Sequence, residues 1–394
     1  MKRLIILVIA LSLVGSFAFA ENTGDITQTG DHNDAEAVQN GDNEATVEQV
    51  GDYQTATVDQ NGENVGGVYQ LYDGSHNTAE LSQDGNNEAW ITQGVPNWTN
   101  YAASDANWNE ASVEQMGENY AVLEQYGGTN SSNGNEGEIT QNGDGNVAYA
   151  YQGWTYYGWG PEPGQPTWAL KSYNSDVNIS QVNNENSAYV WQYGGNRNDV
   201  AVAQDGIGNL ASITQGFIYV DHDYSFTHPV YNTQDNNASV TQTGDDNIGK
   251  LMQIGDNNSF KLSQTGSGNS VGFDDDDGTQ LPDRNEYFYQ DGDNNQFAGL
   301  NKSGDNISFR ANWDAEQHNG ALLDAGSEGI TGYYGSFQQG DDNVIGLRQG
   351  ASDEALIQQL GNNNTSTLWQ QGSGTNEATM LQNGNNNTAS LIQE

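Results

Sequence analysis

The sequence predicts an all-β fold, a β-solenoid of stacked strand–turn–strand repeats with loop inserts. One sign is a seven-residue pattern with Asn, a small residue, an apolar residue and Gln at every second position, as in residues 43–49. Because side chains along a β-strand alternate between two faces, these four share one face. Another sign is repetition: 20 segments place Asn six residues before Gln, and three more begin with Gln54, Ser175 or Asp353. All six prolines lie outside these segments, as central strands require.

The first 20 residues are typical of a signal peptide. Lys2 and Arg3 precede an apolar run over residues 4–14, and Ala18-Phe19-Ala20 resembles a cleavage site. The apolar run is shorter than the ~20 residues that a membrane-spanning helix needs. We therefore expect an exported protein that is not membrane-spanning.

Residues 21–270 form the first predicted repeat array. Successive Gln residues of the pattern are 10 to 12 residues apart in its regular parts, while the Asn-to-Gln spacing stays at six. The turns thus absorb changes in length and the strands keep their register. Two units, about 22 residues, would form one rung, whose inner face neighbouring rungs must cover. Inserts at about 154–174 and 216–233 interrupt the array and are predicted to be loops.

Residues 271–340 are predicted to hold an acidic insert followed by degenerate repeats. The insert contains four consecutive aspartates at 274–277, and residues 319–323 keep the alternation but lose the Gln. This region is either a weak second array or a cap. The full pattern resumes in the second repeat array, residues 341–394. The 23 segments predict roughly eleven or twelve rungs, a stack on the order of 55 Å long at a strand spacing of 4.7–4.9 Å.

Amide side chains recur at equivalent positions and would form ladders along the stack. Asn above Asn and Gln above Gln can hydrogen-bond, while the aliphatic residues between them pack as in cross-β assemblies. A buried amide without a partner is costly, so the ladders should be nearly continuous. The predicted structural ladder residues are Asn43, Gln49, Asn87, Gln93, Asn209, Gln215, Asn247, Gln253, Asn258, Gln264, Asn387 and Gln393.

The charge of the chain argues against several classes of partner. With a formal net charge of −43, neither nucleic acid nor anionic lipid is expected to bind. Acidic residues such as Glu44 and Glu48 stand at outward positions, where stacked like charges repel. We expect acid, salt or divalent cations to speed assembly, although the charge is also explained by solubility alone. The repeats run from Asn22 to Gln393 without an evident capping helix, which predicts growth by end-to-end addition.

The motif Gln-x-Gly-x-x-Asn-x-Ala-x-Φ-x-Gln, where Φ is apolar, resembles the curlin repeat of bacterial curli fibres. Residues 242–253 and 382–393 follow it closely, and the resemblance covers most of residues 22–270 and 343–394. It implies a secreted functional amyloid at the cell surface of a Gram-negative bacterium, where such fibres serve biofilm matrix and adhesion. It also implies self-association, a nucleator subunit, an outer-membrane export pore and chaperones. The Gly/Asn-rich leader that serves export of curli subunits is not seen. The chain is also longer, more acidic and more interrupted than the compact major subunit, so a minor subunit, nucleator or adhesin is an alternative.

No catalytic constellation, cofactor or metal site is predicted. Asp221, His222, Asp223 and His228, like the aspartates at 274–277, match no metal-binding motif and are read as solvated loops. The basic residues are scattered, which argues against an enzyme that cleaves acidic polymers. The alternative function is a monomeric acidic β-solenoid that binds carbohydrate or another surface through aromatic inserts such as that around Trp154.

Overall fold

The computed structural model describes residues 22–94, 108–126, 134–155, 169–170, 172–193, 195–216, 234–271, 288–291, 296–301, 308–309, 336–339, 341–349, 354–370 and 376–393. The predicted signal peptide and most of the predicted inserts, including the aspartates at 274–277, lie outside the described residues. Within them the fold is the predicted all-β solenoid.

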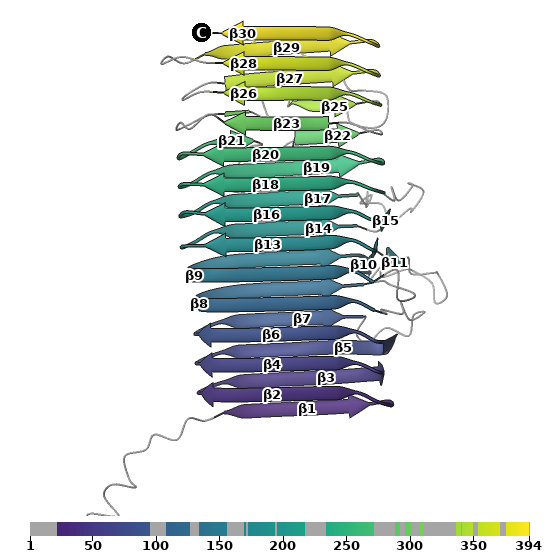
Figure 1. The fold of residues 1–394 in the computed structure, drawn as a ribbon, viewed down its shortest axis with the longest axis vertical. Coiled ribbons are helices and arrows are strands. Elements are labelled where there is room, and N and C mark those ends of the chain that lie inside the picture. Colours follow the sequence, from purple (N-terminus) through teal and green to yellow (C-terminus); the bar gives the residue numbers. More distant parts are fainter. Residues whose placement is uncertain are drawn as a thin grey trace, which may run out of the picture.

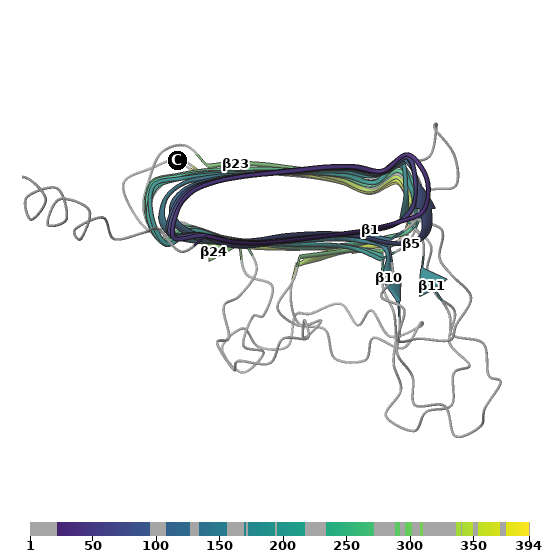
Figure 2. The ribbon, with the colours of Figure 1, turned by 90° about the horizontal axis from the view of Figure 1, so that it is seen from below.

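The chain winds as a flattened coil with two long faces and narrow turns (Figure 2). Successive strands run in opposite directions on opposite faces, and each strand pairs in parallel with the equivalent strand of the next turn (Figure 1). We call one strand from each face, with its turns, a rung. The pairing of Thr23 with Glu44 shows that the first rung is 21 residues long, close to the predicted 22.

Each face is a column of parallel strands, stacked in chain order. The first face contains β1 (Thr23–Thr29), β3 (Glu44–Asp52), β5 (Val65–Ser75), β7 (Glu88–Gln93), the second halves of β8 (Glu110–Gln125) and β9 (Glu136–Gln152), β14 (Ser187–Gln192), β17 (Leu210–Gln215), β19 (Ile248–Ile254), β21 (Ser270–Val271) with β22 (Phe288–Asp291), β24 (Ser308–Phe309) with β25 (Phe337–Gln339), β27 (Glu354–Leu360) and β29 (Glu377–Asn383). The second face contains β2 (Asp34–Gly41), β4 (Thr55–Gly62), β6 (Thr78–Gly85), the first halves of β8 and β9, β13 (Asp176–Val182), β16 (Asp199–Asp205), β18 (Asn237–Thr243), β20 (Ser259–Thr265), β23 (Gln296–Asn301), β26 (Val344–Gln349), β28 (Thr365–Gln370) and β30 (Thr388–Gln393).

Two short pairs lie outside this sheet. β10 (Trp154–Thr155) pairs antiparallel with β11 (Ala169–Leu170), so the ends of the first predicted insert meet as a short hairpin. β12 (Ser172–Tyr173) pairs in parallel with β15 (Gly195–Asn196). Figure 2 shows β10 and β11 projecting from the coil beside the first face.

The core follows from the alternation in each strand. In β18 the inward residues Ala238, Val240 and Gln242 are buried, while the residues between them face outward. The same small and aliphatic positions pack on one another from rung to rung and form a single hydrophobic cluster along the stack. Small, β-branched and aliphatic residues suit this half-buried pleated geometry. Stacking, rather than a globular core, therefore supplies the burial.

The turns require unusual backbone conformations at fixed places. Most residues before an asparagine-ladder position on the second face have positive φ, as in His32 (61°) and Asp235 (56°), a conformation in which His, Asp and Asn are enriched. Gly41 has φ of 118°, and a Cβ there would lie 2.1 Å from the carbonyl oxygen of Gly62 in the next rung. Only glycine fits where successive turns approach so closely.

The region left open by the sequence, 271–340, contributes strands to the same stack. β22 and β25 continue the first face, and β23 continues the second, in parallel pairing with regular strands on either side. Figure 1 shows these strands between the two regular arrays. The strands described in this region therefore extend the solenoid, with shorter pairing than in the regular rungs.

Candidate functional site: amide ladders and stack ends

Glutamine side chains form a hydrogen-bonded ladder at the end of the strands on each face. Gln49 donates through Nε2 to Oε1 of Gln70 at 2.8 Å, and Gln70 donates in the same way to Gln93. On the second face, Gln204 donates to Gln242, which donates to Gln264. In every such described pair the residue of the earlier rung donates, at 2.7–3.0 Å. The ladders thus have a direction.

The second N–H of each glutamine amide tends to reach across the core. Nε2 of Gln49 also donates to the carbonyl oxygen of Asp34, at the start of the opposite strand, at 3.0 Å. Nε2 of Gln93 donates to the carbonyl oxygens of Thr78 and Asn109, both at 3.0 Å. These bonds tie the two faces together and satisfy buried donors that would otherwise be costly.

Asparagine side chains form a second kind of ladder at the strand starts. Oδ1 of Asn209 accepts from the backbone N–H of Asn247 at 3.1 Å and from its Nδ2 at 2.9 Å. Nδ2 of Asn247 also donates to the carbonyl oxygen of Gly266 in the following turn at 2.8 Å. Each asparagine therefore joins its own strand start to the turn and to the neighbouring rung.

The structure places the predicted ladder residues on both faces. Asn209 and Asn247 are direct neighbours, as are Gln215 and Gln253, whose amides are bonded at 3.0 Å. Those on the first face are Asn43, Gln49, Asn87, Gln93, Asn209, Gln215, Asn247 and Gln253, and those on the second are Asn258, Gln264, Asn387 and Gln393. All are buried except the pair in the last rung, Asn387 and Gln393.

Sequence reasoning missed Gln338, a glutamine of the first-face ladder, and also Gln290, whose backbone is in register with it. Gln290 is in register with Gln253, and Gln338 in turn is in register with Gln290. Gln338 is buried and donates to Oε1 of Gln359 at 2.9 Å. Neither has Asn six residues before it, but each is followed by x-Gly, the turn signal that follows most ladder glutamines. That signal was available in the sequence.

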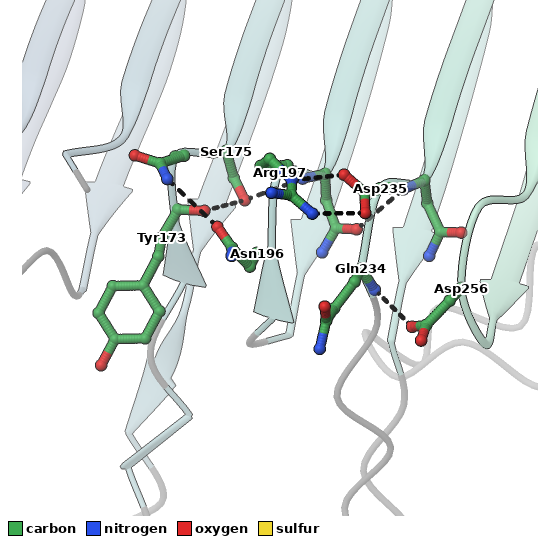
Figure 3. A network of polar contacts seen from close by, with 10 residues as sticks. Tyr173, Ser175, Asn196, Arg197, Gln234, Asp235 and Asp256 are labelled. Atoms are coloured by element: carbon green, nitrogen blue, oxygen red, sulfur yellow. Dashed lines mark hydrogen bonds and ion pairs between the residues drawn. The ribbon is translucent and has the colours of Figure 1, made fainter. Parts of the chain in front are cut away.

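One position shows how a ladder tolerates a change of residue type. Ser175 occupies an asparagine position of the second face, and its Oγ accepts from the backbone N–H of Asn198 at 3.2 Å. Figure 3 shows Ser175, Arg197 and Asp235 one after another on three successive turns. Nη2 of Arg197 donates to Oδ2 of Asp235 at 2.7 Å, and this contact lowers the pKa of the Asp235 carboxyl. An exposed ion pair thus accompanies the irregular rung.

The two ends of the described stack leave inward-facing residues uncovered. All residues of β1 are exposed, including Ile26 at 45%, although Ile26 stands at an inward apolar position. At the other end, Ala389 and Leu391 of β30 are only partly buried. Both end rungs also present backbone groups on the side away from the stack. Such edges are templates for pairing with a further strand.

The outer surface of the second face carries a column of carboxylates. Glu110, Glu136, Asp176 and Asp199 are in register on successive rungs. Burial, together with the neighbouring carboxylates, raises the pKa of Glu136 and Asp176, and burial raises that of Asp199. Ionised carboxylates held at strand spacing repel one another, and this repulsion disfavours the ionised form of each.

Aromatic rings also stack from rung to rung. At one turn edge, the rings of His32, Tyr53, His76 and Trp108 follow one another with centroids 4.6, 4.9 and 4.0 Å apart and nearly parallel planes. On the outer surface of the first face, Tyr149 stacks on Tyr189 at 5.4 Å. Stacking of this kind adds to cohesion along the axis. It also turns the ring faces toward one another rather than toward a ligand.

Two kinds of feature are absent among the residues that the structure describes. No group of three or more His, Cys, Asp or Glu side chains in them is arranged to hold a metal ion. No helix among them is long and apolar enough to cross a membrane. The histidines and aspartates at 221–228, and most of the aromatic insert at 154–174, lie outside this part of the chain.

Comparison with known proteins identifies the repeat. A comparison with curated proteins finds no significant match. Residues 233–279 match the family described as the curlin associated repeat. The matched segment includes β18, β19 and β20, which the ladder residues Asn236, Asn247 and Asn258 directly precede. The resemblance predicted from the sequence is confirmed for residues 233–279, which carry the curlin associated repeat.

Proposed function

We propose that this protein is a secreted structural subunit that self-assembles through cross-β stacking into curli-like fibres. The observation that carries the proposal is the state of the two end rungs. Ile26 and Leu391 stand at inward positions that are fully buried in the middle of the stack, yet they are exposed or only partly buried at its ends. A further copy would cover both.

The interior supplies the energy for such stacking. Each added rung buries aliphatic residues and extends two glutamine and two asparagine ladders, all by bonds already present between described rungs. Cross-β assemblies are stabilised by this combination of dry packing and amide ladders. The curlin repeat, typical of curli-type structural subunits, supports the same function.

The setting follows from the same proposal. The fibres would lie outside the cell, exported through an outer-membrane pore with the help of chaperones and started by a nucleator subunit. Biofilm matrix and surface adhesion are the roles that such fibres would serve.

Fibre X-ray diffraction of the mature chain, incubated without denaturant, tests the proposal. We expect fibres with meridional intensity near 4.7 Å. A chain that stays monomeric and rich in β-structure through acid and salt screens would contradict it. That result would favour the alternative of a solenoid that binds carbohydrate through its aromatic inserts.

A further inference from the structure

The two ends of the stack differ in ways that make them complementary to each other. The glutamine ladders run one way: Nε2 of Gln370 donates to Oε1 of Gln393 in the last rung, just as Gln28 donates to Gln49 in the first. Beyond Gln393, the next residue of the ladder must supply an amide oxygen as the acceptor. Before Gln28, the preceding residue of the ladder must supply an amide N–H as the donor. The last rung of one copy therefore suits the first rung of another, whereas two identical ends would oppose like groups.

The two ends also differ in charge. The outward positions of β2 in the first rung include Asp34 and Glu36, whereas the equivalent positions of β30 in the last rung are Thr388 and Ser390. Two first rungs docked on each other would bring acidic side chains together, which is destabilising across strands. A first rung docked on a last rung sets each carboxylate beside a hydroxyl group. Charge thus favours the same orientation as the ladders.

An apolar contact on the outer surface fixes the register. Outward positions are mostly polar, yet Ile392 in the last rung is 59% exposed and Val38 in the first rung is 50% exposed. Ile392 is in register with Trp369, itself 38% exposed and packed against the Arg348 guanidinium 5.0 Å from its ring. Aligning Gln393 with Gln39 places Val38 directly beyond Ile392. The apolar row then continues across the junction.

We propose that a second copy of this chain docks its first rung on the last rung, in one orientation, with Val38 of one copy beside Ile392 of the other. This inference rests on the proposed self-assembly and adds the partner surface, its direction and its register. Val38 and Ile392 each lose exposure at the junction, and the row from Trp369 onward becomes continuous.

Disulfide trapping tests the contact, because the natural chain contains no cysteine. In-register parallel neighbours have Cα atoms about 4.8 Å apart, within the ~4.4–6.8 Å range that a disulfide spans. The double variant Val38→Cys with Ile392→Cys, assembled and then oxidised, should give a ladder of covalent multimers on a denaturing gel. Val38→Cys alone should give no covalent dimer above the background of unassembled chains.

A matched control uses an apolar residue far from either end. Ile207, 47% exposed in a turn of the central stack, replaces Ile392 in the variant Val38→Cys with Ile207→Cys, which should not crosslink into multimers. Multimers from this pair would mean nonspecific oxidation and would overturn the assignment. Dimers from Val38→Cys alone would show that first rungs meet and would also overturn it.

A charge exchange separates this inference from the proposed function. Val38→Glu should slow fibre elongation at least tenfold, and adding Ile392→Lys in the same chain should restore most of the rate through a contact across the junction. If the unaltered chain forms no fibres, the proposed function fails. If it forms fibres that Val38→Glu leaves unaffected, or that Ile392→Lys does not rescue, self-assembly stands and this contact is wrong.

Discussion

Replacing a single ladder glutamine tests whether the amides hold the stack together. Gln215 is fully buried, and its Oε1 accepts from Gln192 while its Nε2 donates to Oε1 of Gln253, both at 3.0 Å. Its Nε2 also lies 3.3 Å from the carbonyl oxygens of Asp199 and Asn236. In Gln215→Leu the side chain keeps its approximate size but loses every one of these bonds.

The expected cost follows from the groups left behind. Oε1 of Gln253 loses its ladder donor and one N–H of Gln192 loses its ladder acceptor, each inside a core that water does not reach. A buried polar group without a partner costs about 1–3 kcal/mol, so two such groups lower the free energy of unfolding by about 2–6 kcal/mol. Leucine recovers part of this by burying apolar surface, which places the net loss near the lower limit.

Native-state hydrogen exchange is the suitable assay, because long repeat arrays need not unfold in one step. A loss of about 2 kcal/mol corresponds to roughly 30-fold faster exchange of the amides in β17 and β19. The control is Gln28→Leu in the exposed first strand, where water satisfies the groups left behind and less than about 0.5 kcal/mol is expected. Equal protection in Gln215→Leu and the unaltered chain would refute the ladder argument.

Three other changes probe packing, turns and charge. Ile213→Ala, at a fully buried core position, should lower the local free energy of unfolding by about 2–5 kcal/mol, measured by native-state hydrogen exchange of β17; a loss below about 1 kcal/mol would contradict tight packing. Gly41→Ala adds a Cβ 2.1 Å from the Gly62 carbonyl oxygen at a φ of 118°, so a lower melting temperature by circular dichroism is expected; an unchanged one would show that the turns can separate. The pKa of Asp176 is raised by burial and by Asp199, so the folded state holds this proton more tightly than the unfolded state does. The contribution of this carboxylate column to the free energy of unfolding should therefore rise as pH falls toward the unfolded-state pKa near 3.9. The Asp176→Asn variant should be more stable than the unaltered chain at pH 7 but not below about pH 4. A constant difference in stability between the two chains across that range would contradict the assignment.

The strands themselves could be predicted from the sequence because their cause is local. Ala238, Val240 and Gln242 alternate with outward residues, and this alternation alone sets which side chains meet in the core. The bonds from ladder glutamines to the opposite strand could not be predicted, because they depend on how far apart the faces lie. The aromatic column that begins at His32 and Tyr53 was missed for a similar reason. Those residues are adjacent only because successive turns share one backbone conformation.

The irregular rungs show what the stack requires at a ladder position. Ser175 replaces asparagine, yet its hydroxyl oxygen still accepts the backbone N–H of Asn198, as Oδ1 does in a regular rung. Gln338 lacks an asparagine partner in its own segment, yet it donates to Gln359 at the usual distance. The fold therefore depends on an acceptor or donor at a given place in the register rather than on one residue type. The sequence pattern specifies residue types and is therefore a stricter criterion than the fold. For this reason the pattern identified the regular arrays and missed the rungs between them.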